Sequence, residues 1–480
     1  MFKILARIFF GLSLVALASC AAPRQLGVIQ SFEAERKLGE EQLPQFLLSR
    51  GGVYSNAELS QYIGEITKRL VATVDVPEPF RPLRVRVLNT SAPSAFALPG
   101  GAIFVSRGII GIANDEAQLA GVIAHEISHV VARHSAKRIA ENEKRILEIV
   151  REQDQSLRGA PRSRQIAIFE QELEARLGDI ASFSKDQELE ADRLGLQMVI
   201  AAGYDPSGCG ELLERIDNFE NRRLLRTGVG ADELKEIVER SGYPELSERL
   251  AALGTFPKTT PDTAGRDRLM QVIDGMTFDD RYQGALVRDG AYWHPVQRLS
   301  FKVPPEIVPL HGATFRMVSK HGRIDLRIED ADNVTLDGLV KGLREAETRP
   351  FEAKKTVFNG FPAIVSRIKF NQARDEFVSE IAIIDLGRRF AIFGLLTKPE
   401  DESKIRPYFS EVLNSVRKTS LTEVPKRRRY ETRRIRSGDS VTSLLDESTF
   451  GEDGEAQLRL LNGLEEGQLP AVGNWIKLVD

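Results

Sequence analysis

The segment His125-Glu126-Ile127-Ser128-His129 contains residue types at a spacing that could do chemistry. On a helix, positions i and i+4 share a face, so both imidazoles would project together and offer two nitrogen ligands to one tetrahedral Zn²⁺. Glu126 would lie beside the metal, where its carboxylate could take a proton from a zinc-bound water. With only 6 His in 480 residues, this spacing arises by chance on the order of once in a hundred such chains. The segment therefore predicts a zinc site with Glu126 as the general base.

The helix that would present these residues is predicted to be buried, because apolar residues surround the motif. These residues are Val122, Ile123, Ile127, Val130 and Val131. A buried helix needs a reason to contain two histidines and a glutamate; the alternative is a pair of core histidines with satisfied hydrogen bonds. His134 would be rotated by about 140° from His129 on a continuous helix, so we expect His134 to be a structural partner and not a ligand.

A catalytic zinc site needs a third protein ligand and an open fourth position. The best candidates are Glu188 and Asp192, which lie four residues apart on a second predicted helix, while Glu190 points elsewhere. One carboxylate could bind the metal and the other could accept a hydrogen bond from a ligand histidine. The spacing leaves open which of the two does which, and an acidic cluster alone is more often a solvated helix face.

The elements around these motifs can be placed from the sequence pattern. Helical periodicity predicts helices over 25–71, 117–134 and 182–202. Alternation of polar and apolar residues predicts a strand over 84–88, and Pro99-Gly100-Gly101 predicts a turn before a second strand over 102–105. We expect these two strands to form a hairpin.

Three separated motifs, in this order, resemble one known family. They are Ala95–Gly101 with Ile103–Val105, the HExxH segment running into Val130–His134, and Glu188–Asp192. The set is similar to the HtpX and CAAX-prenyl-protease-type zinc metallopeptidases (gluzincins), and closest to their soluble periplasmic BepA-like branch. The resemblance covers about residues 30–273.

The resemblance implies a role for each matching residue. It makes His125, His129 and Glu188 the ligands of one Zn²⁺ per chain, Glu126 the general base, and Asp192 the hydrogen-bond partner of a ligand histidine. It also implies that the hairpin receives substrate as an added strand, a mode that tolerates many sequences because backbone groups make the contacts. The residues expected to bind substrate in this way are Ala97, Leu98, Gly100, Gly101 and Ile103.

The chain departs from the family pattern at three points. Ser94 stands where the family usually has Asn, and Phe256 stands where it often has His in a Thr-His-Pro segment. In the BepA-like branch that His can cap the zinc, so this form of self-inhibition should be missing or replaced. The tetratricopeptide repeats of that branch are absent, which weakens a transfer of its partners.

The N-terminus predicts an exported lipoprotein. Lys3 and Arg7 precede a short apolar run, and the segment ends in Leu17-Ala18-Ser19-Cys20, which resembles the bacterial lipobox in which the cysteine is acylated. We expect residues 1–20 to be a lipoprotein signal peptide and Cys20 to anchor the chain to a membrane, with the outer membrane implied because no Asp follows. Cys209 is then expected to be a structural thiol.

Composition excludes several classes of protein. Hydrophobic residues at 42% and charged residues at 28% are typical of a globular protein. Lys and Arg number 66 and Asp and Glu number 69, so no global field attracts nucleic acid, and we expect no nucleic-acid partner.

The remainder of the chain predicts further domains. Strand-like alternation over 276–420 indicates an antiparallel α+β domain of unknown role, and 421–432 is a basic linker. Residues 433–480 resemble a LysM module, a βααβ fold that binds N-acetylglucosamine-containing glycan, so peptidoglycan is a possible partner. The predicted fold class is α+β multidomain, beginning with a mainly helical peptidase domain with a small hairpin or sheet at 21–275.

These patterns predict a zinc-dependent metalloendopeptidase that faces the periplasm and cleaves unfolded or misassembled envelope proteins. The alternative is a chaperone-like or scaffolding lipoprotein, tethered to peptidoglycan, with little turnover. An intact Glu126 favours the first hypothesis, because a purely structural zinc site has no use for a base.

Overall fold

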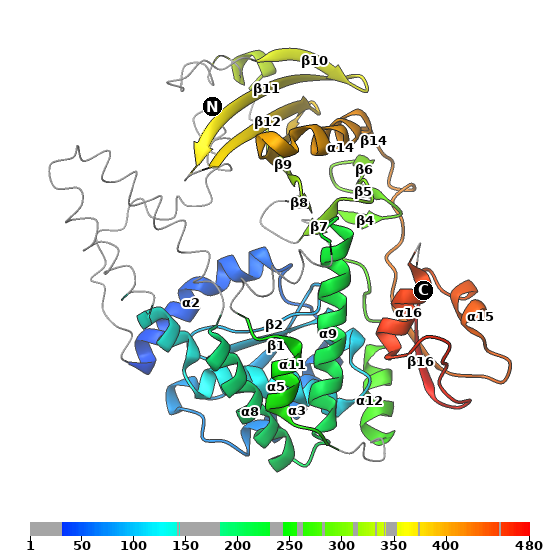
Figure 1. The fold of residues 1–480 in the computed structure, drawn as a ribbon. Coiled ribbons are helices and arrows are strands. Elements are labelled where there is room, and N and C mark those ends of the chain that lie inside the picture. Colours follow the sequence, from blue (N-terminus) through cyan, green and yellow to red (C-terminus); the bar gives the residue numbers. More distant parts are fainter. Residues whose placement is uncertain are drawn as a thin grey trace.

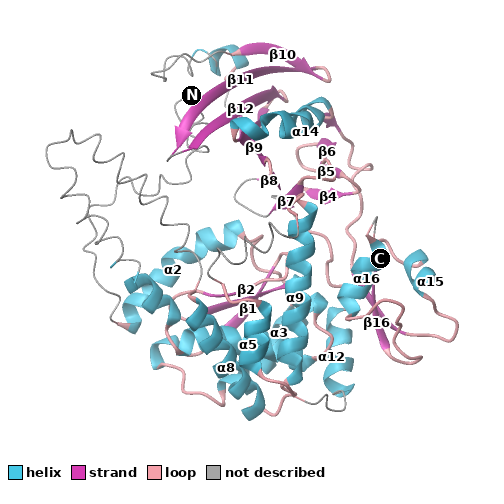
Figure 2. Cartoon of the chain, in the orientation of Figure 1, coloured by secondary structure: helices cyan, strands magenta, loops and turns pink. Residues whose placement is uncertain are grey.

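The structure is a computed structural model. It describes residues 31–141, 144, 183–230, 243–256, 263–280, 284–310, 315–331, 334–339, 341, 353–372, 375–450 and 453–480. The expected signal peptide and Cys20 lie outside these residues. Figures 1 and 2 show a helical domain, a sheet domain at the other end of the molecule, and a C-terminal module beside the helical domain. Every helix in the described stretches is too short or too polar to cross a bilayer.

The helical domain is built around a small sheet. Its helices are α2 (Phe32–Ser49), α3 (Ala57–Val71), α4 (Arg107–Ile112), α5 (Glu116–Val131), α8 (Lys185–Ala201), α9 (Ser207–Arg226), α11 (Leu246–Leu253) and α12 (Thr263–Ile273). Its strands are β1 (Arg84–Leu88), β2 (Ala95–Ala97) and β3 (Ala102–Ser106). The expected helix over 25–71 is therefore two helices in its described part, separated by Gly51-Gly52, both of which have positive φ.

The strand pairing differs from the expected hairpin. The sheet order is β1-β3-β2. β1 is parallel to β3, whereas the hairpin partner of β3 is β2, through the turn at Leu98–Gly101. β2 is only three residues long and follows Pro93, so its pattern was too short to be recognised as a strand.

Helices α5 and α8 form the centre of the domain. Asp115 caps the N-terminus of α5: its side chain accepts a hydrogen bond from the backbone N–H of Gln118 at 2.9 Å. Thirteen of the sixteen residues of α5 are buried. α8 begins with a capping box between Ser184 and Gln187. The two helices approach closely at Gly195, where an added Cβ would lie 3.0 Å from the backbone N of His125. A side chain at Gly195 would therefore push α8 away from α5.

The sheet domain contains two antiparallel sheets. The larger has the order β10-β11-β12-β13-β9-β8-β7, and the smaller has the order β14-β6-β5-β4. The strands are β4 (Leu286–Arg288), β5 (Ala291–His294), β6 (Leu299–Lys302), β7 (Val308–Leu310), β8 (Phe315–Ser319), β9 (Gly322–Asp330), β10 (Lys354–Phe358), β11 (Phe361–Gln372), β12 (Asp375–Asp385), β13 (Arg389–Thr397) and β14 (Arg417–Lys418). Helix α14 (Glu402–Asn414) buries its apolar face in the same hydrophobic cluster as both sheets. The expected mixed α+β architecture is observed.

The C-terminal module has the order β15 (Tyr430–Arg434), α15 (Val441–Asp446), α16 (Gly454–Asn462) and β16 (Trp475–Val479), with the two strands antiparallel. The module shares one hydrophobic cluster with the helical domain. The buried Lys477 donates hydrogen bonds from Nζ to the backbone oxygens of Gly111 and Ala113, at 2.9 and 2.7 Å. These contacts fix the module against α4. β15 begins at Tyr430, inside the range expected for the linker.

Candidate metal centre

Two helices bring the predicted ligand residues together. His125, Glu126 and His129 lie on α5, and Glu188 and Asp192 lie on α8. All but His125 are buried, and His125 is partly buried. The close approach of the helices at Gly195 places the carboxylates of α8 beside the imidazoles of α5.

The ligand atoms of His125, His129 and Glu188 all lie within 4.8 Å of one another. The Nε2 atoms of the two histidines are 3.0 Å apart, and the carboxylate oxygens of Glu188 lie 3.4 Å from His125 Nε2 and 3.8 Å from His129 Nε2. Tetrahedral zinc with bonds of about 2.1 Å requires ligand atoms about 3.4 Å apart. Glu188 Oε2 is also buried and makes no hydrogen bond with the described residues. This donor set fits a zinc ion.

Asp192 points to the opposite nitrogen of His125. Its Oδ1 lies 2.9 Å from His125 Nδ1, so Nδ1 can donate a proton to the carboxylate while Nε2 stays free for a metal. Although burial raises the pKa of Asp192, hydrogen bonds from Arg249 and His125 lower it to about 2. The geometry thus assigns the two roles that spacing alone left open between these carboxylates: Glu188 faces the Nε2 atoms, and Asp192 orients a histidine.

Glu126 is placed for proton transfer. It lines the same cavity as His125 and is 7% exposed. Burial is the main cause that raises its pKa, to about 7. A carboxylate whose pKa lies near neutrality can both accept and return a proton at physiological pH.

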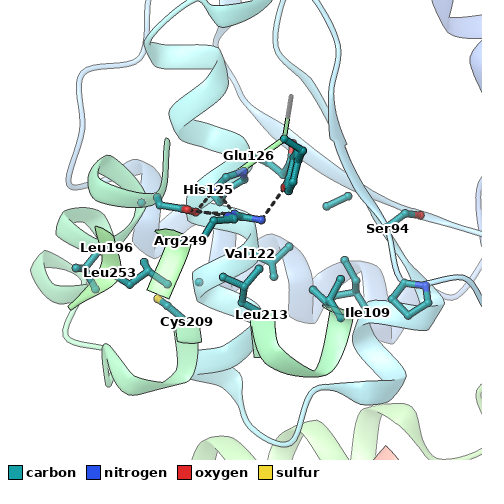
Figure 3. A pocket seen from close by; sticks show the side chains of 17 residues that line it. Ser94, Ile109, Val122, His125, Glu126, Leu196, Cys209, Leu213, Arg249 and Leu253 are labelled. Atoms are coloured by element: carbon teal, nitrogen blue, oxygen red, sulfur yellow. Dashed lines mark hydrogen bonds and ion pairs between the residues drawn. The ribbon is translucent and has the colours of Figure 1, made fainter. Parts of the chain in front are cut away.

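Arg249 and Tyr243 complete the site and were missed in the sequence. Arg249 donates from Nε and Nη2 to Asp192, and from Nη1 to Tyr243 Oη at 2.6 Å. Figure 3 shows Arg249 against His125, with these interactions dashed. Arg249 lies on α11, a short helix about 57 residues after Asp192, and no local pattern links the two.

His134 is a structural partner, as expected, but the break in the helix that brings it to the site was not predicted. α5 ends at Val131, and Arg133 has φ of 57°, so the helix does not continue to His134 as expected. Because the helix is interrupted here, His134 Nδ1 lies 2.9 Å from His129 Nδ1, and His134 Nε2 lies 3.2 Å from Glu190 Oε2. His134 is therefore a partner of His129, and Glu190 is the partner of His134.

The protons on His129 and His134 can be assigned from the geometry. If His129 keeps Nε2 free for a metal, its Nδ1–H donates to His134 Nδ1, and His134 Nε2–H donates to Glu190. Burial lowers the pKa of His134, which favours the neutral ring that this arrangement requires. Phe183 stacks on the ring of His129 at a centroid distance of 4.0 Å and further fixes its orientation.

The residues expected to bind substrate do not all lie at an open edge. Ile103 is on β3, the central strand, and its side chain is fully buried. At Gly100 an added Cβ would overlap with Arg36 of α2, so α2 covers the turn; at Gly101 it would lie 2.9 Å from Leu83. Substrate binding at these three residues stays a prediction; among the residues that the structure describes, the edge strand beside β3 is β2.

The free backbone groups of β2 follow from its register. Leu98 N bonds to Ala102 O, and Ser106 N bonds to Ser94 O. In an antiparallel pair the bonded positions alternate, so Phe96 bonds to β3 while Ala95 and Ala97 direct N–H and C=O groups to the outside. Of the residues expected to bind substrate, Ala97 is at this edge.

A cavity of about 150 Å³ lies between the edge of β2 and α5. Ser94 and Ala95 line it beside β2, and His125 and Glu126 line it from α5, together with apolar side chains. Figure 3 labels Ser94, His125 and Glu126 among the lining residues. The apolar wall includes Val122, Leu213 and Ile216.

Comparisons with known proteins agree with this site. Residues 57–262 match the model of peptidase family M48. The mitochondrial metalloendopeptidase OMA1 of Schizosaccharomyces pombe is 35% identical over 161 residues, which cover 34% of this chain and 45% of that protein. The beta-barrel assembly-enhancing protease of Escherichia coli K12 is 30% identical over 193 residues, which cover 40% of this chain and 39% of that protein. The matches thus span less than half the length of these relatives.

Proposed function

Residues 57–262 form a peptidase domain of family M48, and from this premise we propose that the chain is a zinc-dependent endopeptidase of the cell envelope. Its substrates would be unfolded or misassembled periplasmic and outer-membrane proteins. The single observation that supports the activity is the convergence of His125, His129 and Glu188 beside Glu126, at a cavity that His125 and Glu126 line next to the edge of β2.

In the proposed reaction, a zinc ion held by His125, His129 and Glu188 would act as a Lewis acid and activate a water molecule. Glu126 takes the proton of the attacking water and then donates it to the leaving amine of the cleaved bond. Its raised pKa, near 7, suits both transfers. Asp192 and His134 hold the two histidines in the tautomers that leave Nε2 free.

Substrate would bind as an added strand on β2. The outward N–H and C=O groups of Ala95 and Ala97 would pair with the substrate backbone. This pairing requires an extended and therefore locally unfolded segment, which supports unfolded proteins as the substrate class. Selectivity for sequence would come mainly from the apolar wall near Val122.

The location in the envelope rests on two supports. The segment ending in Cys20 resembles a lipobox, and relatives include proteins named for β-barrel assembly. We place residues 433–480 at peptidoglycan in the same proposal, because the loops that join strands to helices at 436–440 and 465–468 are largely exposed. A pull-down of the chain with purified peptidoglycan, compared with the same pull-down without peptidoglycan, measures this contact.

The test of the activity is cleavage of casein by the zinc-loaded protein beginning after Cys20, with Glu126→Gln beside it. We expect the wild type to cleave, and Glu126→Gln to bind one equivalent of zinc and lose at least about 10²-fold in rate, the lower range for loss of a general base. If both proteins bind zinc and neither cleaves, suppression of casein aggregation by both would favour the chaperone-like alternative. If neither binds zinc, the proposal is wrong.

A further inference from the structure

A second cavity lies away from the metal centre and is lined by residues of α4, α9 and α16. Its volume is about 460 Å³, within the range of roughly 300–1,000 Å³ found for small-molecule sites. α9 contributes to both cavities: Leu213 and Ile216 line the first, and five residues between Phe219 and Arg226 line the second. The second cavity also lies between the helical domain, the sheet domain through Val308, and the C-terminal module.

The wall of this cavity is mostly apolar and mostly helical. Phe219 and Leu225 come from α9, and Leu460 and Leu461 come from α16. Leu225 is 44% exposed, so the apolar wall reaches the surface of the protein at this residue. The backbone N–H and C=O groups within a helix are already bonded, so a buried peptide would leave main-chain groups unpaired at a cost. An acyl chain has no such groups, so the wall favours a lipid-like ligand.

Four arginines line the cavity, and two of them are already held. Arg428 bonds to Asp279 and to the backbone oxygens of Thr449 and Phe450. Arg223 pairs with Glu220 at 2.8 Å. These two guanidinium groups therefore already have partners within the protein.

The other two arginines, Arg222 and Arg226, lie at i and i+4 on α9, so their like charges share one face. Arg226 is 3.6 Å from Asp453 in a pair in which both side chains are more than half exposed, and such pairs contribute little. Arg222 has no hydrogen bond or ion pair with any residue that the structure describes. An anionic group between the two arginines would relieve their repulsion and accept charge-assisted hydrogen bonds.

We propose that this cavity binds a single-chain anionic amphiphile, with the acyl chain against Phe219, Leu460 and Leu461 and the head group on Arg222 and Arg226. The shared chemistry is an acyl chain that ends in a phosphate or a carboxylate. The site does not depend on peptidase activity, and binding can be measured with the inactive Glu126→Gln protein.

The test is equilibrium dialysis of the full mature chain against 1-oleoyl-lysophosphatidic acid below its micelle-forming concentration. Oleate has the carboxylate head, 1-oleoyl-lysophosphatidylcholine has the same chain with a zwitterionic head, and glycerol 3-phosphate has the head without the chain. We expect one lysophosphatidic acid per chain, at least tenfold weaker binding of the choline lipid, and no binding of glycerol 3-phosphate. The comparison of lysophosphatidic acid with oleate tells which head is preferred.

Two variants locate the site. Arg222→Gln with Arg226→Gln changes only exposed side chains and should weaken lysophosphatidic acid binding at least tenfold, while Arg436→Gln, an exposed arginine elsewhere in the C-terminal module, should not change it. Ala456→Phe should fill the cavity and abolish binding of all acyl ligands. Equal binding of the choline lipid, equal binding of glycerol 3-phosphate, or unchanged binding by the double arginine variant would each overturn the proposal. If Ala456→Phe does not fold, the binding measured with the double arginine variant alone tests the proposal.

Discussion

Arg249 holds Asp192 with two parallel hydrogen bonds, from Nε to Oδ2 at 2.8 Å and from Nη2 to Oδ1 at 2.6 Å. Both side chains are at most about a tenth exposed. The same Asp192 oxygen accepts from His125, so Arg249 fixes the carboxylate that orients a metal ligand. The guanidinium also compensates a buried charge that would otherwise be costly.

Replacing Arg249 by Met should therefore weaken zinc binding. The loss of a hydrogen-bonding partner behind a ligand histidine typically costs roughly 10–100-fold in metal affinity, and we expect this range for Arg249→Met. Competition with a zinc chelator measures the affinity. Arg193→Met, on the exposed side of α8 next to Asp192, is the matched control and should leave the affinity unchanged. Equal affinities for both variants would contradict a role for Arg249 in the site.

The second prediction concerns His134. In His134→Leu the Nδ1–H of His129 loses its acceptor while the pocket stays filled. We expect zinc affinity to fall by roughly tenfold or more. His134→Asn keeps an acceptor near the same place and should recover part of the loss. Glu190→Gln should have a smaller effect, because Glu190 is 45% exposed and water can replace it.

These affinities are measured by chelator competition at constant pH, with circular dichroism as a check that each variant is folded. If His134→Leu binds zinc as the wild type does, the contact between His134 and His129 is only structural packing. If Glu190→Gln lowers zinc affinity as much as His134→Leu does, the hydrogen bond between His134 and Glu190 contributes as much as the one between His129 and His134.

The sequence predicted the part of this site that depends on local helix geometry. The ligand spacing of His125 and His129, and the shared face of Glu188 and Asp192, follow from 3.6 residues per turn. Arg249 could not be predicted, because its contact with Asp192 depends on how α11 packs against α8. His134 was predicted as a structural partner, but on the assumption of a continuous helix that the positive φ of Arg133 breaks.

In the fold, too, features set by local sequence pattern were predicted, and features set by long-range packing were not. The long alternating segments of the sheet domain were recognised, because β-branched and aromatic residues persist over many positions. The parallel direction of β1 and β3 was not: the two strands were expected to form an antiparallel hairpin, and a parallel partner leaves no turn between the strands in the sequence. The packing of Lys477 on α4 depends on contacts between residues 364 and 366 positions apart, and no pattern in the sequence records such contacts.

The third prediction is a pH effect on the sheet domain. His294 is buried on β5, and its Nδ1 accepts a hydrogen bond from the backbone N–H of Gln297. Burial, with a contribution from Arg389, lowers its pKa to about 4. Between pH 4 and the unfolded value of about 6.5, the unfolded state binds more protons, so stability rises with pH in that window. The stabilisation is complete above pH 6.5 and is lost as the pH falls to 4.

We expect the sheet domain to lose on the order of 2 kcal/mol across this window through His294. His294→Asn keeps an acceptor for Gln297 and does not titrate, so its stability should change less. Trp293, next to His294, reports unfolding when Trp475, the second of the 2 tryptophans, is replaced by Phe. The measurement is denaturant unfolding by fluorescence at pH 7.5, 6 and 4.5. Parallel pH profiles for the two proteins would show that His294 does not titrate in this range.

The last prediction tests whether the C-terminal module is part of the peptidase core or a free attachment. Gly111 lies on α4, and an added Cβ there would overlap with the ring and Oη of Tyr430 on β15. Because the surroundings are buried, Gly111→Ala should destabilise the chain by about 1–3 kcal/mol. Gly64→Ala is the control: Gly64 is exposed on α3 with no atom within 4 Å of its Cβ, so this change should stabilise by about 0.5–1 kcal/mol.

A double-mutant cycle then assigns the cost to the module. Tyr430→Leu replaces the phenol ring by a shorter aliphatic side chain, so Gly111→Ala should cost less in this background, with a coupling free energy of about 1 kcal/mol or more. The measurement is the free energy of unfolding of the four proteins in denaturant. If the two substitutions change the free energy of unfolding additively, α4 and β15 do not pack against each other at these residues. A module that moves freely would give that result, because a side chain at Gly111 would then simply displace it.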